Sequence, residues 1–268
     1  MRTFAIVNVT RDSFSDGGRY LAPSAAIAHG ERLLAAGADV LDLGAESTHP
    51  DAEDVPAADE LARLVPVVRT FVARGVAVSV DTRKPAVMAG VLPLGVRWLN
   101  DVTGFRSPAA MEVVATAPRD VGFVAMFARS PDGRARENGG NATAAGLLEE
   151  LRAFCRQRVA AFAAAGIGRD RLVLDPGMGF FLGSGAEASL VVLRELPALQ
   201  REFGPLLVSV SRKSFLGAIT GLPVAERWAP TLAAELWAAR AGVSWIRTHD
   251  VQALRAAWAT ECAIAATT

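Results

Sequence analysis

Acidic, amide and cationic side chains recur in this sequence directly after short apolar runs. Asp81 ends one such run, Asn100 comes near the end of another, and Asp175 and Lys213 follow two later ones. Side chains of these types can bind the edge of a flat nitrogen heterocycle, because a carboxylate accepts two parallel N–H bonds from an amino-pyrimidinone as it does from a guanidinium. The four residues together are therefore a candidate heterocycle site.

A second set of residues, Asn8, Arg247 and His249, suits an anion. Arg247 is always charged and can bind a phosphate group through two parallel N–H bonds, and a helix that begins near Val251 would turn its positive end toward the same place. Taken singly, each residue has a structural explanation, since a polar residue after a strand is often a helix cap and a histidine is often packed in the core. The recurrence of polar residues after nearly every apolar run is what favours a functional site.

Short β-branched runs alternate with longer stretches rich in Ala, Leu, Arg and Glu along the whole chain. This alternation predicts an α/β fold of the (β/α)₈ TIM-barrel class, in which the active site is built at the carboxyl ends of the strands. We expect strands near Thr3–Val9, Val40–Leu43, Val76–Asp81, Trp98–Asp101, Val121–Met126, Leu172–Asp175, Leu206–Val210 and Trp245–Thr248. We expect helices near Ser24–Ala36, Ala57–Ala73, Pro85–Leu92, Pro108–Ala117, Ala144–Ala165, Ala186–Leu196, Ala225–Ala241 and from Val251 onward.

The chain is predicted to form one domain along its whole length, because no linker-like stretch interrupts the alternation. Gly37, Gly75 and Gly166 follow three of the predicted helices and are expected to end them in the left-handed conformation. Ser24 and Ser107 stand where two helix N-caps are expected.

Composition limits the classes of function. Hydrophobic residues make up 51% of the 268 residues and charged residues 21%, so a large core can form and disorder is excluded. Lys plus Arg (28) equals Asp plus Glu (28), a balance that argues against nucleic-acid and membrane-surface partners. Cys155 and Cys262 form no disulfide framework and no zinc pattern, and no apolar run reaches the roughly 20 residues that a membrane span needs. We expect a cytoplasmic protein whose partners are small molecules.

A series of sequence blocks resembles, in order, those of the dihydropteroate synthases, a family of (β/α)₈ barrels. The blocks are IVNVTRDSFSDGG, GADVLDLGAESTHP, VSVDTRKPAV, LNDVTGF, VLDPGMGF, VSVSRKSFLG and IRTHDV, and they cover nearly the whole chain. The resemblance implies an enzyme of folate biosynthesis that joins 6-hydroxymethyl-7,8-dihydropterin pyrophosphate to p-aminobenzoate with loss of pyrophosphate. It also implies Mg²⁺ as cofactor.

The same resemblance assigns roles to residues at matching positions. The pterin is expected at Asp81, Asn100, Asp175 and Lys213. The pyrophosphate is expected at Asn8, Arg247 and His249, with Asn8 also reaching Mg²⁺. The p-aminobenzoate is expected at Phe14, Thr48, Pro50, Phe180 and Ser214. Catalytic roles are expected for Asp16, Lys213, Arg247 and His249.

The mechanism that the resemblance implies is a dissociative substitution at the pterin methylene. Pyrophosphate leaves first, with Arg247 and His249 neutralising the charge that it gains, while Asp16 stabilises the positive charge on the pterin carbon. The arylamine then attacks. Ser211 and Ser214 are not expected to act as acyl-transfer nucleophiles, because no His–acid pair accompanies them in the sequence.

The family resemblance further implies a homodimer formed through helices late in the chain. Trp228, Trp237, Trp245 and Trp258 concentrate aromatic surface there, as an interface would. Packing of the same helices onto the barrel is the alternative explanation.

Several positions depart from the family pattern. His49 stands where an arginine is common and is followed shortly by Asp51, Arg11 replaces a proline, and Phe127 replaces a histidine. The run Phe180-Phe181-Leu182 replaces Phe-Gly-Lys and resembles the sulfonamide-insensitive members of the family. We therefore expect reduced sulfonamide sensitivity, because an added aromatic ring could exclude a sulfonyl group that is bulkier than a carboxylate. Lineage drift without a drug phenotype is the alternative.

Two other functions share part of this pattern. A pterin barrel that transfers a methyl group from a folate to a corrinoid protein would use Asp81, Asn100 and Asp175 but has no need of the SRKS and RTHD blocks. A pterin-binding paralogue without catalysis is the non-enzymatic alternative, and only the departures at His49, Arg11 and Phe127 favour it.

Overall fold

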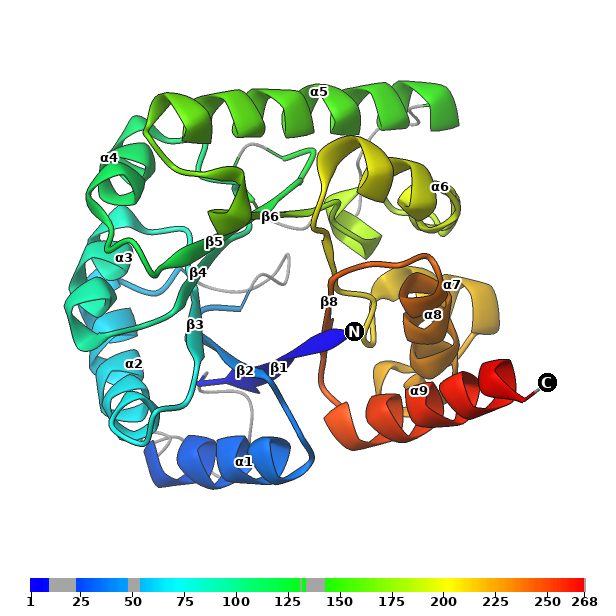
Figure 1. The fold of residues 1–268 in the computed structure, drawn as a ribbon, viewed down its shortest axis with the longest axis horizontal. Helices are drawn as coiled ribbons and strands as arrows, with labels where there is room; N and C mark the ends of the chain where they lie inside the picture. Colours follow the sequence, from blue (N-terminus) through cyan, green and yellow to red (C-terminus); the bar gives the residue numbers. More distant parts are fainter. Residues whose placement is uncertain (10–22, 48–53, 131, 134–142, 268) are drawn as a thin grey trace.

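The computed structural model describes residues 1–9, 23–47, 54–130, 132–133 and 143–267. Parallel strands form a central ring and helices surround it (Figure 1). The strands are β1 (Arg2–Asn8), β2 (Val40–Gly44), β3 (Val78–Asp81), β4 (Trp98–Asp101), β5 (Gly122–Met126), β6 (Leu172–Asp175), β7 (Leu207–Val208) and β8 (Trp245–Thr248).

The strand order closes the ring. The eight strands are hydrogen-bonded in the order β6-β5-β4-β3-β2-β1-β8-β7, and a single parallel bridge between Leu174 and Leu206 connects the two remaining edges. The register places Ile6 beside Asp42 and Trp245 beside Leu207. The predicted (β/α)₈ barrel is therefore confirmed.

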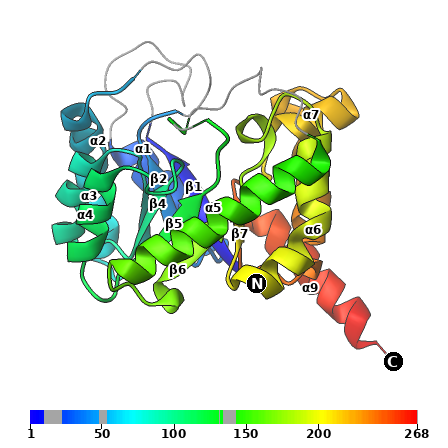
Figure 2. The ribbon, with the colours of Figure 1, turned by 90° about the horizontal axis from the view of Figure 1, so that it is seen from above.

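The helices pack on the outside of the ring. They are α1 (Pro23–Ala35), α2 (Ala57–Val72), α3 (Pro85–Val91), α4 (Pro108–Thr116), α5 (Ala144–Ala164), α6 (Glu187–Phe203), α7 (Ser214–Thr220), α8 (Trp228–Arg240) and α9 (Val251–Ala266). In Figure 2, α7 lies at one end of the barrel, the amino terminus of the chain lies at the other, and the last turns of α9 project away from the body. None of the helices in the described ranges is long and apolar enough to cross a membrane.

Most of the local sequence signals are confirmed. Gly37, Gly75 and Gly166 have φ angles of 93°, 74° and 75°, the left-handed conformation in which glycine ends a helix without strain. The Ser107 side chain accepts a hydrogen bond from the backbone N–H of Ala110 and so caps α4. The predicted cap at Ser24 is wrong, because α1 already begins one residue earlier.

Three element boundaries differ from the prediction because of tertiary contacts. α6 continues through Pro197 to Phe203, since Leu199 and Phe203 are buried and their packing outweighs the missing backbone donor. β7 is shorter than predicted, because the carbonyl of Val210 accepts a hydrogen bond from Lys213 in a turn instead of joining the sheet. The predicted helix Ala225–Ala241 begins only at Trp228, after a short 3₁₀ turn.

The tryptophans occupy different environments. Trp228 and Trp237 are 70% and 53% exposed, and Trp258 packs partly against the core. Trp245 is only 3% exposed and lies inside the barrel against Phe4 and Trp98. The expectation that Trp245 adds aromatic surface to an interface is therefore wrong, whereas it stays open for Trp228 and Trp237.

Candidate active site

The barrel interior changes from aromatic to polar along the strands. Phe4, Trp98 and Trp245 fill it near the amino ends, with ring centroids 4.9, 5.5 and 5.6 Å apart. Because strand side chains alternate between two faces, residues two positions further on also face the interior. Two residues past Val40, Trp98 and Trp245 come Asp42, Asn100 and Arg247. The aromatic layer closes one end of the barrel, and the polar layer opens into a cavity of ≈ 420 Å³ at the carboxyl ends.

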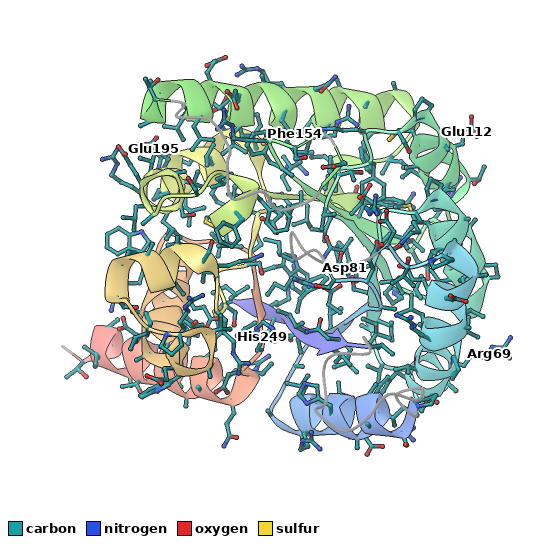
Figure 3. All side chains as sticks on the ribbon, turned by 180° about the vertical axis from the view of Figure 1, so that it is seen from behind. Arg69, Asp81, Glu112, Phe154, Glu195 and His249 are labelled. Atoms are coloured by element: carbon teal, nitrogen blue, oxygen red, sulfur yellow. The ribbon has the colours of Figure 1, made fainter. Side chains whose placement is uncertain are left out.

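The cavity collects most of the described residues that were predicted for the site. Its lining includes Asn8, Asp81, Phe180, Lys213, Ser214, Arg247 and His249. Figure 3 shows Asp81 and His249 on the inner side of the ring of helices, whereas Arg69, Glu112 and Glu195 lie on its outer surface. Asn100 and Asp175 are buried, with 4% and 3% exposure, and are not part of the lining. Phe14, Asp16, Thr48 and Pro50 lie outside the described residues, as do the departures at Arg11, His49 and Asp51.

Arg247 connects two carboxylates across the cavity floor. Its Nε donates to Oδ2 of Asp42 at 2.5 Å, and its Nη2 donates to Oδ2 of Asp81 at 2.6 Å. Burial by itself lowers the pKa of Arg247, but the two carboxylates raise it above its ordinary value. Burial raises the pKa of Asp81, and Arg247 offsets part of that rise. This site therefore holds a fixed cation beside an acid that is available to a ligand.

Asp42 anchors this arrangement from below. It is fully buried, and the Nδ2 of Asn100 also donates to its Oδ2, at 3.3 Å. The second oxygen of Asp42 has no hydrogen-bond partner within the described part of the chain. Sequence reasoning did not include Asp42 among the site residues. A signal was present, because an acidic residue inside an otherwise apolar strand must be paired when both faces of that strand are buried.

Asp175 and Lys213 form the second charged part of the site. Oδ1 of Asp175 accepts the N–H of Gly177 at 2.8 Å, and burial raises the pKa of this carboxyl to about 6. Burial and the nearby Arg247 lower the pKa of Lys213 to about 8. The Lys213 ammonium lies 4.5 Å from the ring centroid of Phe181, one of the residues that depart from the family pattern. Both groups are therefore tuned toward neutral pH by desolvation.

His249 and Ser211 are in contact at the end of β8. Nδ1 of His249 lies 2.9 Å from Oγ of Ser211, which also accepts the backbone N–H of His249 at 3.3 Å. Burial and the neighbouring Arg212 and Arg247 lower the pKa of His249 to about 3. At neutral pH the imidazole is uncharged, so it can bind an anion by donating an N–H bond and not as a cation. This result refines the expectation that His249 neutralises charge.

The Ser211–His249 contact does not make a nucleophilic serine. A histidine with a pKa of about 3 is a poor general base, and no carboxylate bonds to the ring among the hydrogen bonds and ion pairs of the described residues. The absence of a serine nucleophile therefore remains the interpretation that the geometry favours.

Phe180 and Ser214 line the cavity from the stretches that follow β6 and β7. Phe180 belongs to a 3₁₀ turn at Gly179–Phe181, and Ser214 is the first residue of α7. Gly179 has a φ angle of 66°, in the left-handed region that favours glycine, and a Cβ atom there would lie 2.8 Å from the Ser214 hydroxyl oxygen, so glycine fits this close approach without strain.

A buried ion network supports the end of β2. Lys84 Nζ contacts Glu46 at 2.7 Å and the fully buried Glu60 at 2.8 Å, while Arg83 Nε contacts Glu46 at 3.2 Å. Burial by itself raises the pKa of Glu46, but hydrogen bonds from Lys84 and Arg83 lower it below its ordinary value. Arg83 also pairs with Asp54, so Glu46 and Asp54 are both paired with the short segment between β3 and α3. Sequence reasoning missed Glu46, which lines the cavity as a paired carboxylate.

Comparisons with known proteins agree with this geometry. The family model described as "Pterin binding enzyme" matches residues 4–249. The dihydropteroate synthase type-2 of Escherichia coli is 49% identical over 253 residues, which cover 94% of this chain and 92% of that protein.

Solved structures agree as well. A Xanthomonas albilineans dihydropteroate synthase with 4-aminobenzoic acid superposes with a TM-score of 0.89 at 39% identity, covering 100% of this chain and 94% of that one. A structure of that organism's synthase in complex with 7,8-dihydropteroate has a TM-score of 0.86 at 37% identity, with the same coverage. With a ring of acids and amides beside a cationic cradle at the carboxyl ends of its strands, the chain belongs to the pterin binding enzymes, among the dihydropteroate synthases.

Proposed function

We propose that this chain condenses 6-hydroxymethyl-7,8-dihydropterin pyrophosphate with p-aminobenzoate to give 7,8-dihydropteroate and pyrophosphate in folate biosynthesis. The observation that carries the proposal is the shared cavity in which Asp81 and Lys213 approach Arg247 and His249. One ligand can therefore place a flat ring against the acidic residues and an anionic group against Arg247 and His249. The relatives with 4-aminobenzoic acid and 7,8-dihydropteroate support the same pair of substrate and product.

The pterin is held by groups that are almost fully shielded from solvent. Asp175 and Asn100 are buried, so a pterin edge that reaches them replaces no bulk solvent at these groups. A carboxylate at Asp175 accepts two N–H bonds from the amino-pyrimidinone, and Asp81 offers a further acceptor once the ring displaces Arg247 from part of its contact. Lys213 donates from the opposite side, beside Phe181. Fixed donors and acceptors of this kind favour the delocalised cation that remains after pyrophosphate departs.

Pyrophosphate departs toward Arg247 and His249, which line the cavity. Arg247 supplies a permanent positive charge, and neutral His249 supplies a donor without losing a proton. α9 begins at Val251, directly after these residues, and its Ala253 N–H is already capped by Oδ1 of Asp250, so the helix start is not counted among the donors. Asp16 is proposed to stabilise the cationic pterin carbon. No covalent enzyme intermediate is required, so p-aminobenzoate attacks the carbon that pyrophosphate has left.

The cation Mg²⁺ fits the anion side through Asn8. Asn8 is exposed at the end of β1 and lines the cavity, and its amide oxygen is a ligand that Mg²⁺ accepts. Among the described residues no group of three or more His, Cys, Asp or Glu side chains could hold a metal. The protein would therefore supply few ligands and the phosphate oxygens the others, which is the usual mode for this ion. Bound there, Mg²⁺ would neutralise charge on the leaving pyrophosphate.

The p-aminobenzoate is proposed to lie between Phe180 and Ser214, with Phe14, Thr48 and Pro50 completing the pocket. Phe180 lines the cavity with partial exposure, which suits contact with an aryl ring, and the Ser214 hydroxyl can donate to a carboxylate.

The cytoplasmic location remains a prediction from the sequence.

We also propose that two copies of the chain associate through α6, α7 and α8. A second cavity of ≈ 420 Å³ lies among these helices, and it is lined almost entirely by apolar side chains that include Leu190, Ile219 and Trp237. These three residues are 46%, 52% and 53% exposed, and contiguous apolar surface of this kind marks interaction sites. Sedimentation velocity should find a dimer that Trp237→Glu converts to a monomer. Ile264→Glu, at an exposed apolar residue of α9 outside this cavity, should leave the dimer intact.

The activity is tested directly with purified protein, pterin pyrophosphate, radiolabelled p-aminobenzoate and Mg²⁺. We expect labelled dihydropteroate and stoichiometric pyrophosphate, and growth of a synthase-deficient bacterial strain without thymidine. Pterin binding without product would favour the non-catalytic paralogue. Methyl transfer from a folate to a corrinoid protein would favour the second enzymatic alternative.

A further inference from the structure

Arg212 adopts a backbone conformation that costs an L-residue strain. Its φ angle is 59°, and apart from Phe105 it is the only residue other than glycine with a positive φ in the described part of the chain. Arg212 separates Ser211, which contacts His249, from Lys213, which lies near Asp175. The strained residue is therefore the joint between the anion side and the pterin side of the cavity.

Two residues at the start of α8 hold both polar groups of the Arg212 backbone. The N–H of Arg212 donates to Oγ1 of Thr231 at 3.0 Å, and its carbonyl accepts from Nη1 of Arg227 at 3.2 Å. The same guanidinium reaches the carbonyls of Lys213 at 3.4 Å and Leu222 at 3.0 Å. Arg227 and Thr231 are joined by a helical bond, because the N–H of Thr231 donates to the Arg227 carbonyl. Both ends of the strained residue are thus fixed to one helix turn.

Gly217 in α7 makes room for this guanidinium. A Cβ atom at position 217 would lie 2.2 Å from Nη2 of Arg227, closer than any real contact. Alanine at an ordinary helical glycine improves helix formation, so a glycine in the middle of this short helix is otherwise unfavourable. Its presence is explained if the flat guanidinium must lie against α7.

We infer that Thr231, Arg227 and Gly217 form a clamp that keeps Arg212 left-handed and thereby sets the spacing between Ser211 and Lys213. They are positioning residues. The inference rests on the proposed function, in which one substrate spans both sides of the cavity. If the clamp is lost, the segment relaxes toward a right-handed conformation at Arg212, and the two sides no longer fit a single pterin pyrophosphate.

Thr231 gives the cleanest test. Arg227 lines the cavity and could contact a substrate itself, whereas Thr231 is 5% exposed and is not part of the lining. Thr231→Val removes the hydroxyl with little change of shape, and Thr231→Ser keeps it. The decisive background is Arg212→Gly, because glycine adopts a positive φ without strain and needs no clamp.

In the natural background, Thr231→Val should lower kcat about tenfold, since small misplacements of reacting groups are costly, with little change in the KM for p-aminobenzoate. Thr231→Ser should retain the activity. In the Arg212→Gly background the same Thr231→Val change should alter kcat less than about twofold, whatever activity Arg212→Gly alone has lost. The loss of thermal stability should persist in both backgrounds, because the backbone N–H at position 212 stays without its partner.

A second variant approaches the clamp from α7. Gly217→Ala should lower kcat as Thr231→Val does, while Gly185→Ala, where a Cβ atom meets nothing within 4 Å, should leave it unchanged. An equal kcat loss from Thr231→Val in both backgrounds, or full activity in Thr231→Val and Gly217→Ala, would overturn the clamp. An inactive natural chain would instead overturn the proposed function, so the two failures are distinguishable.

Discussion

The pterin side and the aminobenzoate side of the cavity are built from different kinds of structure. Asp81, Asn100, Asp175 and Arg247 stand on strand ends, where the hydrogen-bonded barrel fixes their positions. Phe180 stands on a short turn, and Ser214 stands at the start of α7, directly after Lys213.

The two kinds of structure therefore serve different tasks. The strand ends hold the pterin, at which the substitution takes place, whereas the turn and the helix start select the aryl substrate that attacks it. Strand ends in a barrel are held by neighbours on both sides, so they can carry buried charges at fixed distances. Connecting segments tolerate substitution, and the described departures from the family pattern, Phe127 and the run Phe180-Phe181-Leu182, lie directly after β5 and on the short turn after β6. We therefore expect substitutions on the pterin side to abolish chemistry and substitutions on the aminobenzoate side to change selectivity.

The largest effect is expected at Asp175 on the pterin side. Asp175→Ala removes the acceptor of two substrate N–H groups and should lower kcat/KM for the pterin substrate by at least about 10³-fold. Calorimetry should find no heat of pterin binding. Phe180→Ala is the matched change on the other side and should leave the heat of pterin binding nearly intact. Normal turnover by Asp175→Ala would contradict the claim that the strand ends on the pterin side are required for the reaction.

The second largest loss of kcat/KM is expected at Asp42, although Asp42 contacts no substrate in the proposed arrangement. In Asp42→Asn the anchor of Arg247 is weakened, so Arg247 pairs more fully with Asp81 and competes with the pterin, and kcat/KM should fall about 10- to 100-fold. Glu60→Gln is the control, because Glu60 is also fully buried, with one oxygen that has no hydrogen-bond partner among the described residues, but it pairs with Lys84 and not with Arg247. It should lose stability with less than about threefold change in kcat/KM. Equal kinetic losses in the two variants would show that Asp42 acts only through folding.

The sequence predicted the strand-built side better than the rest, and the reason is physical. A polar residue at the end of an apolar run predicts a position at the carboxyl end of a barrel strand, so Asp81, Asn100 and Asp175 could be named from pattern and resemblance. Asp42 was missed because partners far apart in sequence decide whether a buried carboxylate is structural or functional. The clamp on Arg212 could not be predicted, since φ at a non-glycine residue has no sequence signal. The contact between Ser211 and His249 likewise depends on the shortened β7.

The pH dependence of kcat/KM should report the pterin side alone. Burial raises the pKa of Asp175 to about 6 and that of Asp81 to about 7, so their active carboxylates are present above these values and are lost as the pH falls through them. The lowered pKa of Lys213, about 8, means that its active ammonium is present below this value and is lost as the pH rises. A bell-shaped profile with limbs near these values is expected. Lys213→Arg should remove the basic limb, because arginine keeps its proton to a pH of about 12, and an unchanged basic limb would assign it to another group.

Selectivity on the aminobenzoate side should depend on Phe181. The ring is buried against Lys213 beside Phe180, so Phe181→Ala opens space next to the proposed aminobenzoate pocket. We expect the natural chain to be poorly inhibited by sulfamethoxazole and Phe181→Ala to bind it about tenfold more tightly, a change of about 1.4 kcal/mol. The KM for p-aminobenzoate should change less, and Phe181→Leu should lie between the two. Inhibition of the natural chain as strong as that of a sulfonamide-sensitive synthase would contradict the expectation and favour lineage drift.

The smallest effect is expected at Ser211, and its size separates two mechanisms. Ser211→Ala removes the hydroxyl that fixes the His249 ring, so kcat should fall only about threefold to tenfold through poorer placement of the pyrophosphate donor. Loss of a covalent nucleophile instead costs on the order of 10⁶-fold. Rapid quench during the first turnover should detect no pterin bound covalently to the protein. A modest loss without such an adduct means that Ser211 orients His249, and that the substitution relies on preorganised charge and not on bonding to the enzyme.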